Sequence, residues 1–405
     1  MESNRKTYEE NLTKSEILDK LFKKWNPEIK TETIPVSQAY GRILAETQQA
    51  LYDLPIVRAS SMDGIAVKSQ LFENGMPDTS SWRLGEEYVR ADTGDDFDDA
   101  FDSVIRIEQV DIHPDGSVSI QFPEGVVFER GMNVRPAGAT LKKGSVVAKA
   151  GHRLTPMDLA SLESGGITSI PVIKKPIVGF LPTGSELVAP GAIPQRGQNI
   201  DCNSTLAYHM IQEMGGEPVC YPIVRDKKED LSAALRRALD ECDIVLINGG
   251  SSKGEEDFNT KIIEEYGEMI SHWVKAAPGR PMGVAVAENK PLINLSGPSI
   301  AAFYGMEWCL RPVIARALHT GVSGRQRVPA FLTKDISAPG VIEFLCMLDA
   351  HKNEDGTISA SPANTRNSGR APLSANAMLV TELGTTMYKA GETIMIELLR
   401  PLSEI

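Results

Sequence analysis

Residues 243–254 read DIVLINGGSSKG, and this stretch decides the fold class. Its first part is a short run of apolar residues, typical of a strand that is buried on both faces of a parallel sheet. The run ends at Asn248, and Gly249 and Gly250 follow it. Paired glycines let the backbone turn sharply and let a ligand come close. We therefore expect a buried parallel strand that ends in a ligand-accessible loop.

The segments around this stretch repeat the same alternation of strand and helix. Strand-like apolar runs lie within residues 176–184, 217–224, 243–250 and 290–297, and an amphipathic helical pattern follows each of them. Strands that alternate with helices form a parallel sheet, because right-handed crossovers carry the chain back to the same edge. The sequence predicts a central three-layer α/β domain with a mostly parallel sheet.

The chain outside this region has a different texture. Residues 15–25 place apolar side chains on one face of a helix, and residues 156–164 form a second helix with Thr155 as its N-cap and Gly165 as its stop. Residues 45–141 and 324–405 contain short strand patterns broken by Gly, Pro and Asp. These two segments predict a β-rich domain and a small C-terminal β domain.

The composition excludes several classes of protein. The chain has 405 residues, with 42 Lys and Arg against 54 Asp and Glu, and a net charge of −12. Nucleic-acid-binding proteins usually have a basic footprint, so we expect no nucleic-acid partner. The apolar runs are far shorter than the roughly 20 residues that span a bilayer, and the N-terminus resembles no signal peptide. We therefore expect a cytoplasmic protein without a membrane partner.

The five cysteines are scattered and include no CxxC pair. An odd number of cysteines at irregular spacing fits neither a disulfide framework nor a zinc site. We interpret all five as buried thiols.

Candidate site residues follow three of the predicted parallel strands, at the sheet edge where ligands bind in open α/β folds. The first strand end carries Thr183 and Glu186, the second carries Asp226, and the third begins at Gly249. The third segment continues through Gly250, Ser251, Ser252 and Lys253. Its backbone N–H groups could form an anion-binding nest, although an ordinary turn also fits this segment. It matches neither a Walker P-loop nor a dinucleotide fingerprint.

Three carboxylates at neighbouring strand ends are a separate signal. Glu186, Asp226 and Asp257 would repel one another unless a cation held them. Mg²⁺ takes oxygen ligands from one or two carboxylates together with phosphates and water. The pattern therefore favours Mg²⁺ and a phosphorylated ligand. The other interpretation is that each acid caps the helix that follows it.

Two further loops are unusual, and neither is decisive alone. Residues 58–64, RASSMDG, precede a short strand, and residues 275–281, KAAPGRP, hold two cations, Lys275 and Arg280, and two prolines. A proline-fixed loop is rigid and suits the presentation of cations to an anion. No HExxH or GxSxG motif is present, so the sequence does not point to a zinc hydrolase or an α/β-hydrolase.

The ordered set of these segments resembles the molybdopterin molybdenumtransferases, the MoeA family, which includes the gephyrin E domain. The matching segments run from about residue 10 to about residue 400. They are SSMDGIAV, VRADTGD with SVIRIE, GMNVRPAG, PTGSELV, IVRD, NGGSSKGEEDF, PGRP and LSGPS. Each motif is weak alone, but their order over nearly the whole chain is specific.

The resemblance implies an activity and a fold. The activity is the insertion of molybdate into adenylylated molybdopterin, with Mg²⁺ as a cofactor and release of AMP. The fold has four domains: a discontinuous linking domain (1–44 and 142–175), the β-rich domain (45–141), the α/β molybdopterin-binding domain (176–323) and a C-terminal β-barrel (324–405). The family forms a homodimer in which the α/β domain of one subunit faces the β-rich domain of the other. The molybdopterin adenylyltransferase is an implied partner.

The resemblance also assigns roles to residues of this chain. The implied catalytic residues are Asp63, Glu186, Asp226 and Asp257, and the last three are also the implied Mg²⁺ ligands. The implied substrate-binding residues are Thr93, Thr183, Gly249, Gly250, Ser251, Ser252, Lys275, Arg280 and Ser296. Arg280 stands where the family has a Lys after Pro-Gly, and either cation can pair with phosphate or molybdate.

The chain departs from the family pattern at three places. Ala277 replaces a Lys just before Pro-Gly, Ala139 and Thr140 replace an acidic pair, and residues 296–299 read SGPS instead of Pro-Gly-Asn-Pro. Two alternatives to molybdate insertion therefore remain. One is a paralogue that uses another oxyanion such as tungstate, and the other is a molybdopterin-binding scaffold without turnover.

Overall fold

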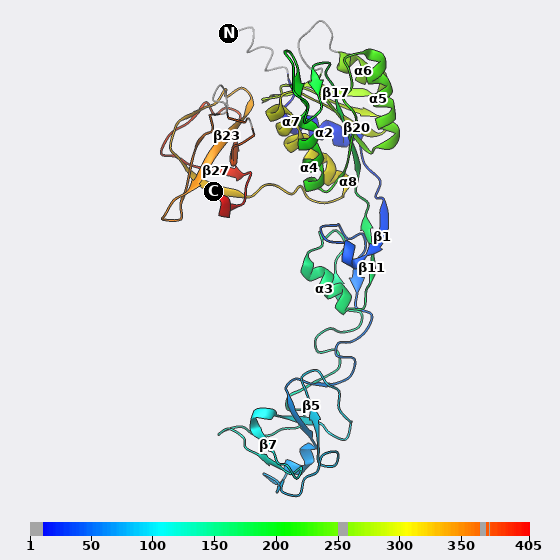
Figure 1. Cartoon of the computed structure of the whole chain (residues 1–405), viewed down its shortest axis with the longest axis vertical. Coiled ribbons are helices and arrows are strands. Elements are labelled where there is room, and N and C mark those ends of the chain that lie inside the picture. Colours follow the sequence, from blue (N-terminus) through cyan, green and yellow to red (C-terminus); the bar gives the residue numbers. More distant parts are fainter. Residues whose placement is uncertain (1–10, 250–257, 365–369, 372) are drawn as a thin grey trace. The chain divides into compact units, whose positions relative to one another are not determined.

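The computed structural model describes residues 11–249, 258–364, 370–371 and 373–405 (Figure 1). The chain divides into two compact units. One takes in the chain up to Lys30 together with Lys174–Ile405, and the other is Thr31–Ile173. No described helix has both the length and the apolar character needed to cross a bilayer. The four predicted domain boundaries remain a prediction.

The first unit is built on a six-stranded sheet with the order β15-β12-β16-β20-β19-β17. The strands are β12 (Ile177–Pro182), β15 (Glu217–Cys220), β16 (Ile244–Asn248), β17 (Glu268–Trp273), β19 (Pro281–Ala287) and β20 (Lys290–Leu295). The pairs β15–β12, β12–β16 and β16–β20 are parallel, whereas β19 pairs antiparallel with both β20 and β17. The prediction of a mostly parallel sheet is confirmed.

The two antiparallel strands β17 and β19 were not predicted. The half-buried edge strand β17 mixes polar and apolar residues, so it lacks the continuous apolar run that marks the central strands. Its hairpin with β19 carries the Pro-Gly-Arg-Pro loop. That loop therefore belongs to the same sheet as the strand ends described above.

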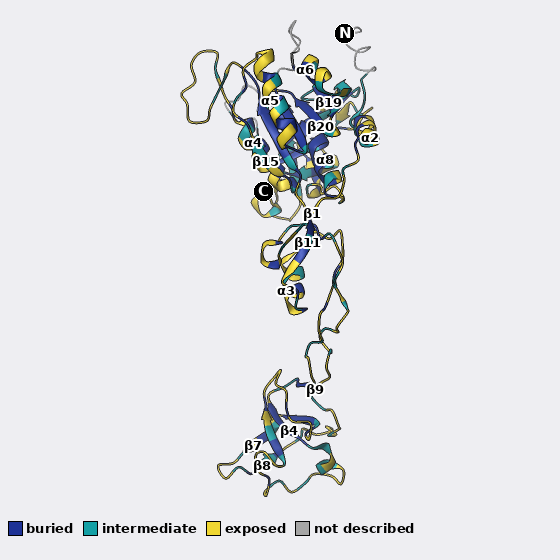
Figure 2. Cartoon of the chain, turned by 90° about the vertical axis from the view of Figure 1, so that its right-hand side faces the viewer, coloured by how far each residue is buried: buried dark blue, intermediate teal, exposed yellow. Residues whose placement is uncertain are grey.

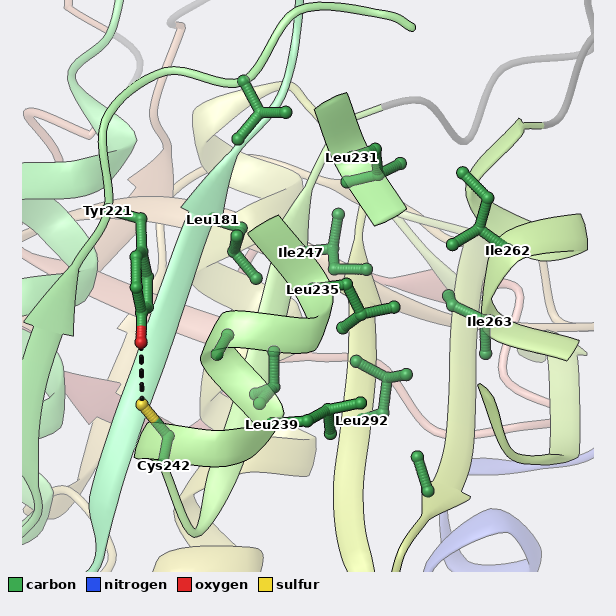
Figure 3. Packing of buried hydrophobic residues seen from close by; sticks show 14 of the residues in the cluster. Leu181, Tyr221, Leu231, Leu235, Leu239, Cys242, Ile247, Ile262, Ile263 and Leu292 are labelled. Carbon is green, nitrogen blue, oxygen red and sulfur yellow. Dashed lines mark hydrogen bonds between the residues drawn. The ribbon is translucent and has the colours of Figure 1, made fainter. Parts of the chain in front are cut away.

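Helices cover both faces of this sheet (Figure 1). They are α2 (Lys14–Lys24), α4 (Asn203–Met214), α5 (Lys228–Glu241), α6 (Phe258–Tyr266), α7 (Ser299–Gly305), the π-helical turn η4 (Met306–Leu310) and α8 (Arg311–Ala317). On one face, α5 and α6 share a core with the strands, and Leu235 and Ile263 belong to the same buried cluster as Leu181 (Figure 3). The predicted three-layer arrangement is confirmed.

The first helix also follows its sequence prediction. Thr13 and Glu16 form a reciprocal capping box at the start of α2, and Ile17, Leu21 and Trp25 are buried. Its basic residues Lys23 and Lys24 lie in the last turn, where cations interact favourably with the helix dipole.

The C-terminal region of the first unit is a closed five-stranded barrel, as predicted. Its strands are β21 (Arg327–Leu332), β23 (Glu343–Lys352), β24 (Ile358–Pro362), β25 (Ala377–Val380) and β27 (Thr393–Leu398). The pairing of β23 with β25 closes the ring, which removes the exposed sheet edges. The short strand β18 (Ala276–Ala277) pairs with β23, and β22 (Ile336–Ser337) pairs with β26 (Met387–Tyr388).

The second unit, Thr31–Ile173, consists of short strands, one α-helix and three 3-10 turns. Its strand pairs are β1 (Thr31–Pro35) with β11 (Ser169–Ile173), β2 (Gln48–Gln49) with β10 (Val146–Ala148), β3 (Ala59–Ser60) with β9 (Val134–Arg135), and β7 (Val110–Ile112) with β8 (Val118–Ile120). A three-stranded sheet joins β4 (Gly64–Val67), β5 (Tyr88–Ala91) and β6 (Ser103–Arg106). The helix α3 (Pro156–Ser164) begins after the predicted N-cap Thr155 and stops at Gly165. In Figure 2 the buried residues of this unit gather on its strands.

The cysteine prediction is only partly correct. Cys242 and Cys309 are buried and Cys346 is half-buried, but Cys202 and Cys220 are exposed. Cys202 directly precedes α4 and Cys220 ends β15, an edge strand of the sheet. Whether a cysteine at a strand end is buried depends on which helix covers that end. The residues next to the cysteine in the sequence do not predict this packing.

Candidate functional site

The carboxyl ends of the parallel strands enclose a cavity of about 890 Å³. Because β15, β12, β16 and β20 are neighbours and parallel, the residues that follow them meet at one edge of the sheet. The lining residues of the cavity come from these strand ends, from the start of α4 and from the loops before β19 and α7. They are Thr183, Glu186, Leu187, Asn199, Ile200, Asp201, Cys202, Asn203, Asn248, Gly249, Pro278, Gly279, Pro281, Ser296, Gly297, Pro298, Ser299 and Ala301.

Thr183 and Gly249 lie against each other at the floor of this cavity. The backbone N–H of Thr183 donates to the carbonyl of Asn248 at 2.9 Å, and its hydroxyl donates to the same oxygen at 3.2 Å. Gly249 has a φ of +121°, and a Cβ at this position would come within 2.4 Å of the Thr183 carbonyl oxygen. Only glycine therefore fits at the start of this loop, where the sequence predicted a sharp turn.

The first two predicted carboxylates lie at adjacent strand ends. Asp226 Oδ2 accepts a hydrogen bond from the backbone N–H of Ser185 at 2.8 Å, and Ser185 Oγ accepts one from the Asp226 N–H at 3.2 Å. This reciprocal pair fixes the loop after β12 to the loop after β15. Glu186 is exposed at the cavity, and its carboxylate lies over Gly184.

The third predicted carboxylate, Asp257, lies outside the described residues, as do Gly250, Ser251, Ser252 and Lys253. Within the described part of the chain, no group of three or more His, Cys, Asp or Glu side chains could hold a metal ion. The predicted Mg²⁺ site therefore remains a prediction.

Ser296 lines the cavity, but its hydroxyl proton is already engaged. Ser296 Oγ donates to the carbonyl of Pro281 at 2.6 Å, and the side chain is 7% exposed. While it donates to Pro281, the Ser296 hydroxyl can therefore accept a hydrogen bond from a ligand but cannot donate one.

The two predicted cations are not among the residues that line the cavity. The Arg280 guanidinium lies over the indole of Trp273, 5.2 Å from the ring centroid. In the amide orientation that satisfies both groups, Asn11 Oδ1 accepts from Arg280 Nη2 at 3.0 Å and from Nε at 3.1 Å. Lys275 lies in a segment whose backbone bonds to Leu12 and Glu343. Both neighbours of Arg280, Gly279 and Pro281, do line the cavity.

In the second unit, Asp63 and Thr93 form the pair that the resemblance singled out. Asp63 Oδ1 accepts from the Thr93 backbone N–H at 2.6 Å and from the Thr93 hydroxyl at 2.7 Å. These two bonds lower the pKa of Asp63 below its usual value, first through the hydroxyl and then through the backbone donor. The exposed carboxylate is therefore a fixed negative charge on this unit.

The backbone around Asp63 brings three sequence motifs together. Ser60 accepts a bond from Gly94 and donates its N–H to Asp95, while Ser61 donates to the carbonyl of Asn133. A Cβ on Gly64 would lie 1.9 Å from the carbonyl oxygen of Ile105, so the SMDG turn requires glycine there. The motifs SSMDGIAV, VRADTGD and GMNVRPAG thus form one structural element.

Sequence reasoning missed the contribution of residues 201–203 to the cavity. Asp201 caps the start of α4, because its Oδ1 accepts from the Ser204 N–H at 3.0 Å. Cys202 lies beside Ser299, with 3.2 Å between Sγ and Oγ. The Asp-x-x-Ser spacing before the helix was a usable signal for the cap. Nothing in the local pattern indicated that Asn203 would reach the cavity.

Comparisons with known proteins agree with this geometry. A family model described as the MoeA N-terminal region (domain I and II) matches residues 8–166, and one described as a probable molybdopterin binding domain matches residues 179–316. A molybdopterin molybdenumtransferase of Bacillus subtilis is 28% identical over 389 residues, which cover 91% of this chain and 90% of that protein.

Two archaeal proteins are also similar. A putative molybdopterin biosynthesis protein of Methanocaldococcus jannaschii is 31% identical over 306 residues, 71% of this chain and 74% of that protein. The crystal structure of a molybdopterin biosynthesis MoeA protein from Pyrococcus horikoshii matches with a TM-score of 0.80 at 25% identity. That match covers 97% of this chain and 100% of the other.

Proposed function

Because the chain belongs to the MoeA family, we propose that it is a molybdopterin molybdenumtransferase of molybdenum cofactor biosynthesis. The proposed reaction is the insertion of molybdate into adenylylated molybdopterin with release of AMP. The observation that carries the proposal is the cavity of about 890 Å³, whose lining residues all fall in the segment that matches a molybdopterin binding domain. The proposed partner is a molybdopterin adenylyltransferase, which would supply the adenylylated substrate. Both proteins are proposed to be cytoplasmic.

We propose that different residues of the cavity lining bind different parts of the substrate. We assign the pterin and its phosphate to the glycine-rich segment that begins at Gly249, with Thr183 and Ser296 beside it. Among the described residues of the lining, only Glu186 and Asp201 carry charge, and both are negative. An anionic substrate at this place therefore needs a cation to offset the repulsion.

The donor set fits Mg²⁺ in this role. Glu186 is exposed at the cavity, and Asp226 engages one of its two carboxylate oxygens on Ser185, so oxygen ligands of the preferred kind are at hand. Together with Asp257 they would hold the ion, which would neutralise charge on the phosphates of the bound substrate. The protein groups themselves orient the substrate and keep its phosphates at the strand ends.

We also propose that the active cleft is shared in a homodimer, with Asp63 acting on the substrate bound by the other subunit. The segment just before SMDG exposes several large apolar side chains, which suits a surface covered by a second copy. Leu51 is 57% exposed, Ile56 69% and Val57 47%.

The central experiment measures AMP release from adenylylated molybdopterin in the presence of Mg²⁺ and molybdate. Molybdate-dependent release supports the proposal. Binding of the substrate without release would favour the scaffold alternative, and release with tungstate but not molybdate would favour the other oxyanion.

A binding measurement that does not depend on turnover uses the cysteines. Cys202 lines the cavity, whereas Cys220 is exposed outside it, so alkylation of the two thiols can be compared by mass spectrometry. We expect molybdopterin to slow the alkylation of Cys202 at least tenfold and to leave Cys220 unchanged. Equal rates with and without ligand would place the ligand elsewhere.

The shared cleft has its own test. Asp63→Asn keeps the hydrogen-bond acceptor but removes the charge, and Asp226→Ala removes a carboxylate from the α/β side. Mixing the two inactive variants should restore activity, because some mixed dimers regain one intact cleft. No recovery after proven subunit exchange would contradict the shared cleft.

A further inference from the structure

Four asparagines are buried directly around the cavity floor. They come from α4, β16, α6 and β20, and they are Asn203 (7% exposed), Asn248 (3%), Asn259 (3%) and Asn294 (0%). A buried amide is unfavourable unless it is hydrogen-bonded. Asn203, Asn248 and Asn259 all donate from Nδ2, whereas Asn294 Nδ2 has no partner among the described residues. Two of the four, Asn203 and Asn248, line the cavity itself.

The pair formed by Asn203 and Asn248 ties three segments together. Asn203 Nδ2 donates to Asn248 Oδ1 at 2.8 Å and to the carbonyl of Gly297 at 2.7 Å. Asn248 Nδ2 donates to the carbonyl of Ser296 at 2.8 Å. The start of α4, the end of β16 and the loop after β20 are therefore joined through these two side chains.

Gly249, the first residue of the glycine-rich segment, is held by Leu295 and Asn259 and borders the loop that the pair holds. The Gly249 N–H donates to the carbonyl of Leu295 at 3.0 Å, and its own carbonyl accepts from Asn259 Nδ2 at 2.8 Å. A Cβ on Gly297 would lie 3.9 Å from the Gly249 Cα, so the loop that the Asn pair holds borders the glycine directly. A shift of that loop would change the space above Gly249.

We propose that Asn203 and Asn248 are positioning residues for the molybdopterin-binding cavity. They hold the loop at Ser296 and Gly297 against the end of β16, and so set the width of the floor on which the pterin rests. They act through backbone groups and not on the reacting atoms. The inference rests on the proposed function, because it assumes that molybdopterin occupies this cavity.

The chemistry of the amide explains why asparagine is needed at these positions. Each side chain donates to a backbone carbonyl, and Asn248 also accepts from Asn203. An aspartate has nearly the same shape, but in its ionised form it can only accept hydrogen bonds. It would therefore face the Ser296 or Gly297 carbonyl without a proton to donate. The repulsion would move the loop outward, although the volume of the side chain would hardly change.

The test compares Asn248→Asp and Asn203→Asp with Asn376→Asp. Asn376 is a matched control, because its amide also makes two bonds to backbone, donating to the Ala350 carbonyl at 2.8 Å and accepting from the Ala350 N–H at 2.7 Å. It lies in the barrel and does not line the cavity. The measurements on the full-length variants are thermal unfolding, KM and kcat for AMP release, and protection of Cys202 by molybdopterin.

We expect all three variants to lose similar stability but to differ in binding. Asn248→Asp and Asn203→Asp should raise the KM for the molybdopterin substrate at least tenfold, which corresponds to about 1.4 kcal/mol, with kcat changed less than threefold. Protection of Cys202 should need correspondingly more ligand. Asn376→Asp should change KM less than twofold. The KM of the double variant should be no higher than that of the single variant with the larger KM, because the two amides work as one unit.

Two outcomes would overturn the inference. One is a folded Asn248→Asp or Asn203→Asp protein whose KM matches that of Asn376→Asp, and the other is the unfolding of both cavity variants, which would make the amides purely structural. Failure of the wild-type protein to bind or turn over the substrate would instead contradict the proposed function. The two failures are therefore distinguishable.

Discussion

Asp63 carries its charge at a lower pH than an ordinary aspartate, because Thr93 donates two hydrogen bonds to one of its oxygens. The pKa in the folded protein lies below the usual value of 3.8. These bonds therefore stabilise the fold above pH 3.8, and their contribution is lost as the pH falls through the folded pKa. At neutral pH the Asp63 carboxyl is fully ionised and carries a full negative charge.

We predict that Thr93→Val raises the pKa of Asp63 toward 3.8, because the variant removes the hydroxyl donor and keeps the backbone donor. Carboxyl-carbon NMR titration measures this directly. Thr357→Val is the matched control, since Thr357 donates to Asp355 in the same way from its hydroxyl and its backbone. It should leave the Asp63 titration unchanged. An identical Asp63 pKa in wild type and Thr93→Val would show that the hydroxyl contributes nothing.

Arg280 is the second residue whose environment yields a prediction. If its guanidinium recruits the anion, Arg280→Ala should raise the molybdate concentration for half-maximal rate at least about tenfold, because a charge-assisted hydrogen bond contributes roughly 1.5–3 kcal/mol. Arg316 is a matched control: its guanidinium lies 5.5 Å from the Phe22 ring centroid and donates to Asn26 at 3.0 Å. Arg316→Ala should leave the molybdate dependence unchanged.

The opposite result is equally informative. Unchanged molybdate dependence in Arg280→Ala would mean that its bonds with Asn11 and its contact with Trp273 serve the fold alone. The sequence identified this arginine by its rigid loop, but it could not reveal the direction of the side chain. That direction depends on Trp273, across the hairpin, and on Asn11, which reaches the loop only when the first helix packs on the sheet.

At the scale of elements, the central strands were predictable and the edge strand β17 was not. Because β12, β16 and β20 are buried on both faces, their sequences are continuous apolar runs. A capping motif predicts the start of α3. The half-exposed β17 carries no such signal. Likewise, the polar strand ends were visible in the sequence, whereas the contact between Asn203 and Asn248 joins residues 45 positions apart. Only the folded sheet brings them together.

The π-helical turn between α7 and α8 anchors another long-range network. Glu307 bonds to both Arg311 and Arg325, and Arg311 also bonds to Glu213 of α4. The side chains of Glu307 and Arg311 are only 9% and 8% exposed. This network fastens the segment that leads into the barrel to the α/β domain.

We predict that Glu307→Gln lowers the free energy of unfolding by about 3 kcal/mol or more, because removing one partner of a buried ion pair leaves uncompensated charge on the arginines. Urea unfolding measures the change. Glu265→Gln is the control, since its pair with Lys228 is half-exposed on both sides and should contribute less than about 1 kcal/mol. Equal losses in the two variants would contradict the importance of burial.

At the scale of the whole molecule, the chain passes between its two units only twice, after Lys30 and before Lys174. The two crossing points lie side by side, because the Lys174 N–H donates to the Lys30 carbonyl at 2.8 Å. The second unit is therefore an insertion into a single connection of the first.

We predict that a chain in which three glycines replace Thr31–Ile173 still folds, because the junction residues are already neighbours. It should unfold cooperatively on heating and retain the protection of Cys202 by molybdopterin, but it should lack turnover without Asp63. Expression of Thr31–Ile173 alone is the complementary control. A deletion protein without cooperative unfolding would show that the first unit depends on the second.

The same insertion has a consequence for how the protein is made. The first helix, α2, packs against β17 and β19, and Lys24 bonds to Glu268, 244 residues further along the chain. At synthesis rates of about 5–20 residues per second, α2 would leave the ribosome roughly 12–50 s before its partner strands exist. The inserted unit is complete well before then. During translation, the exposed apolar face of α2 would thus be a natural target for a chaperone.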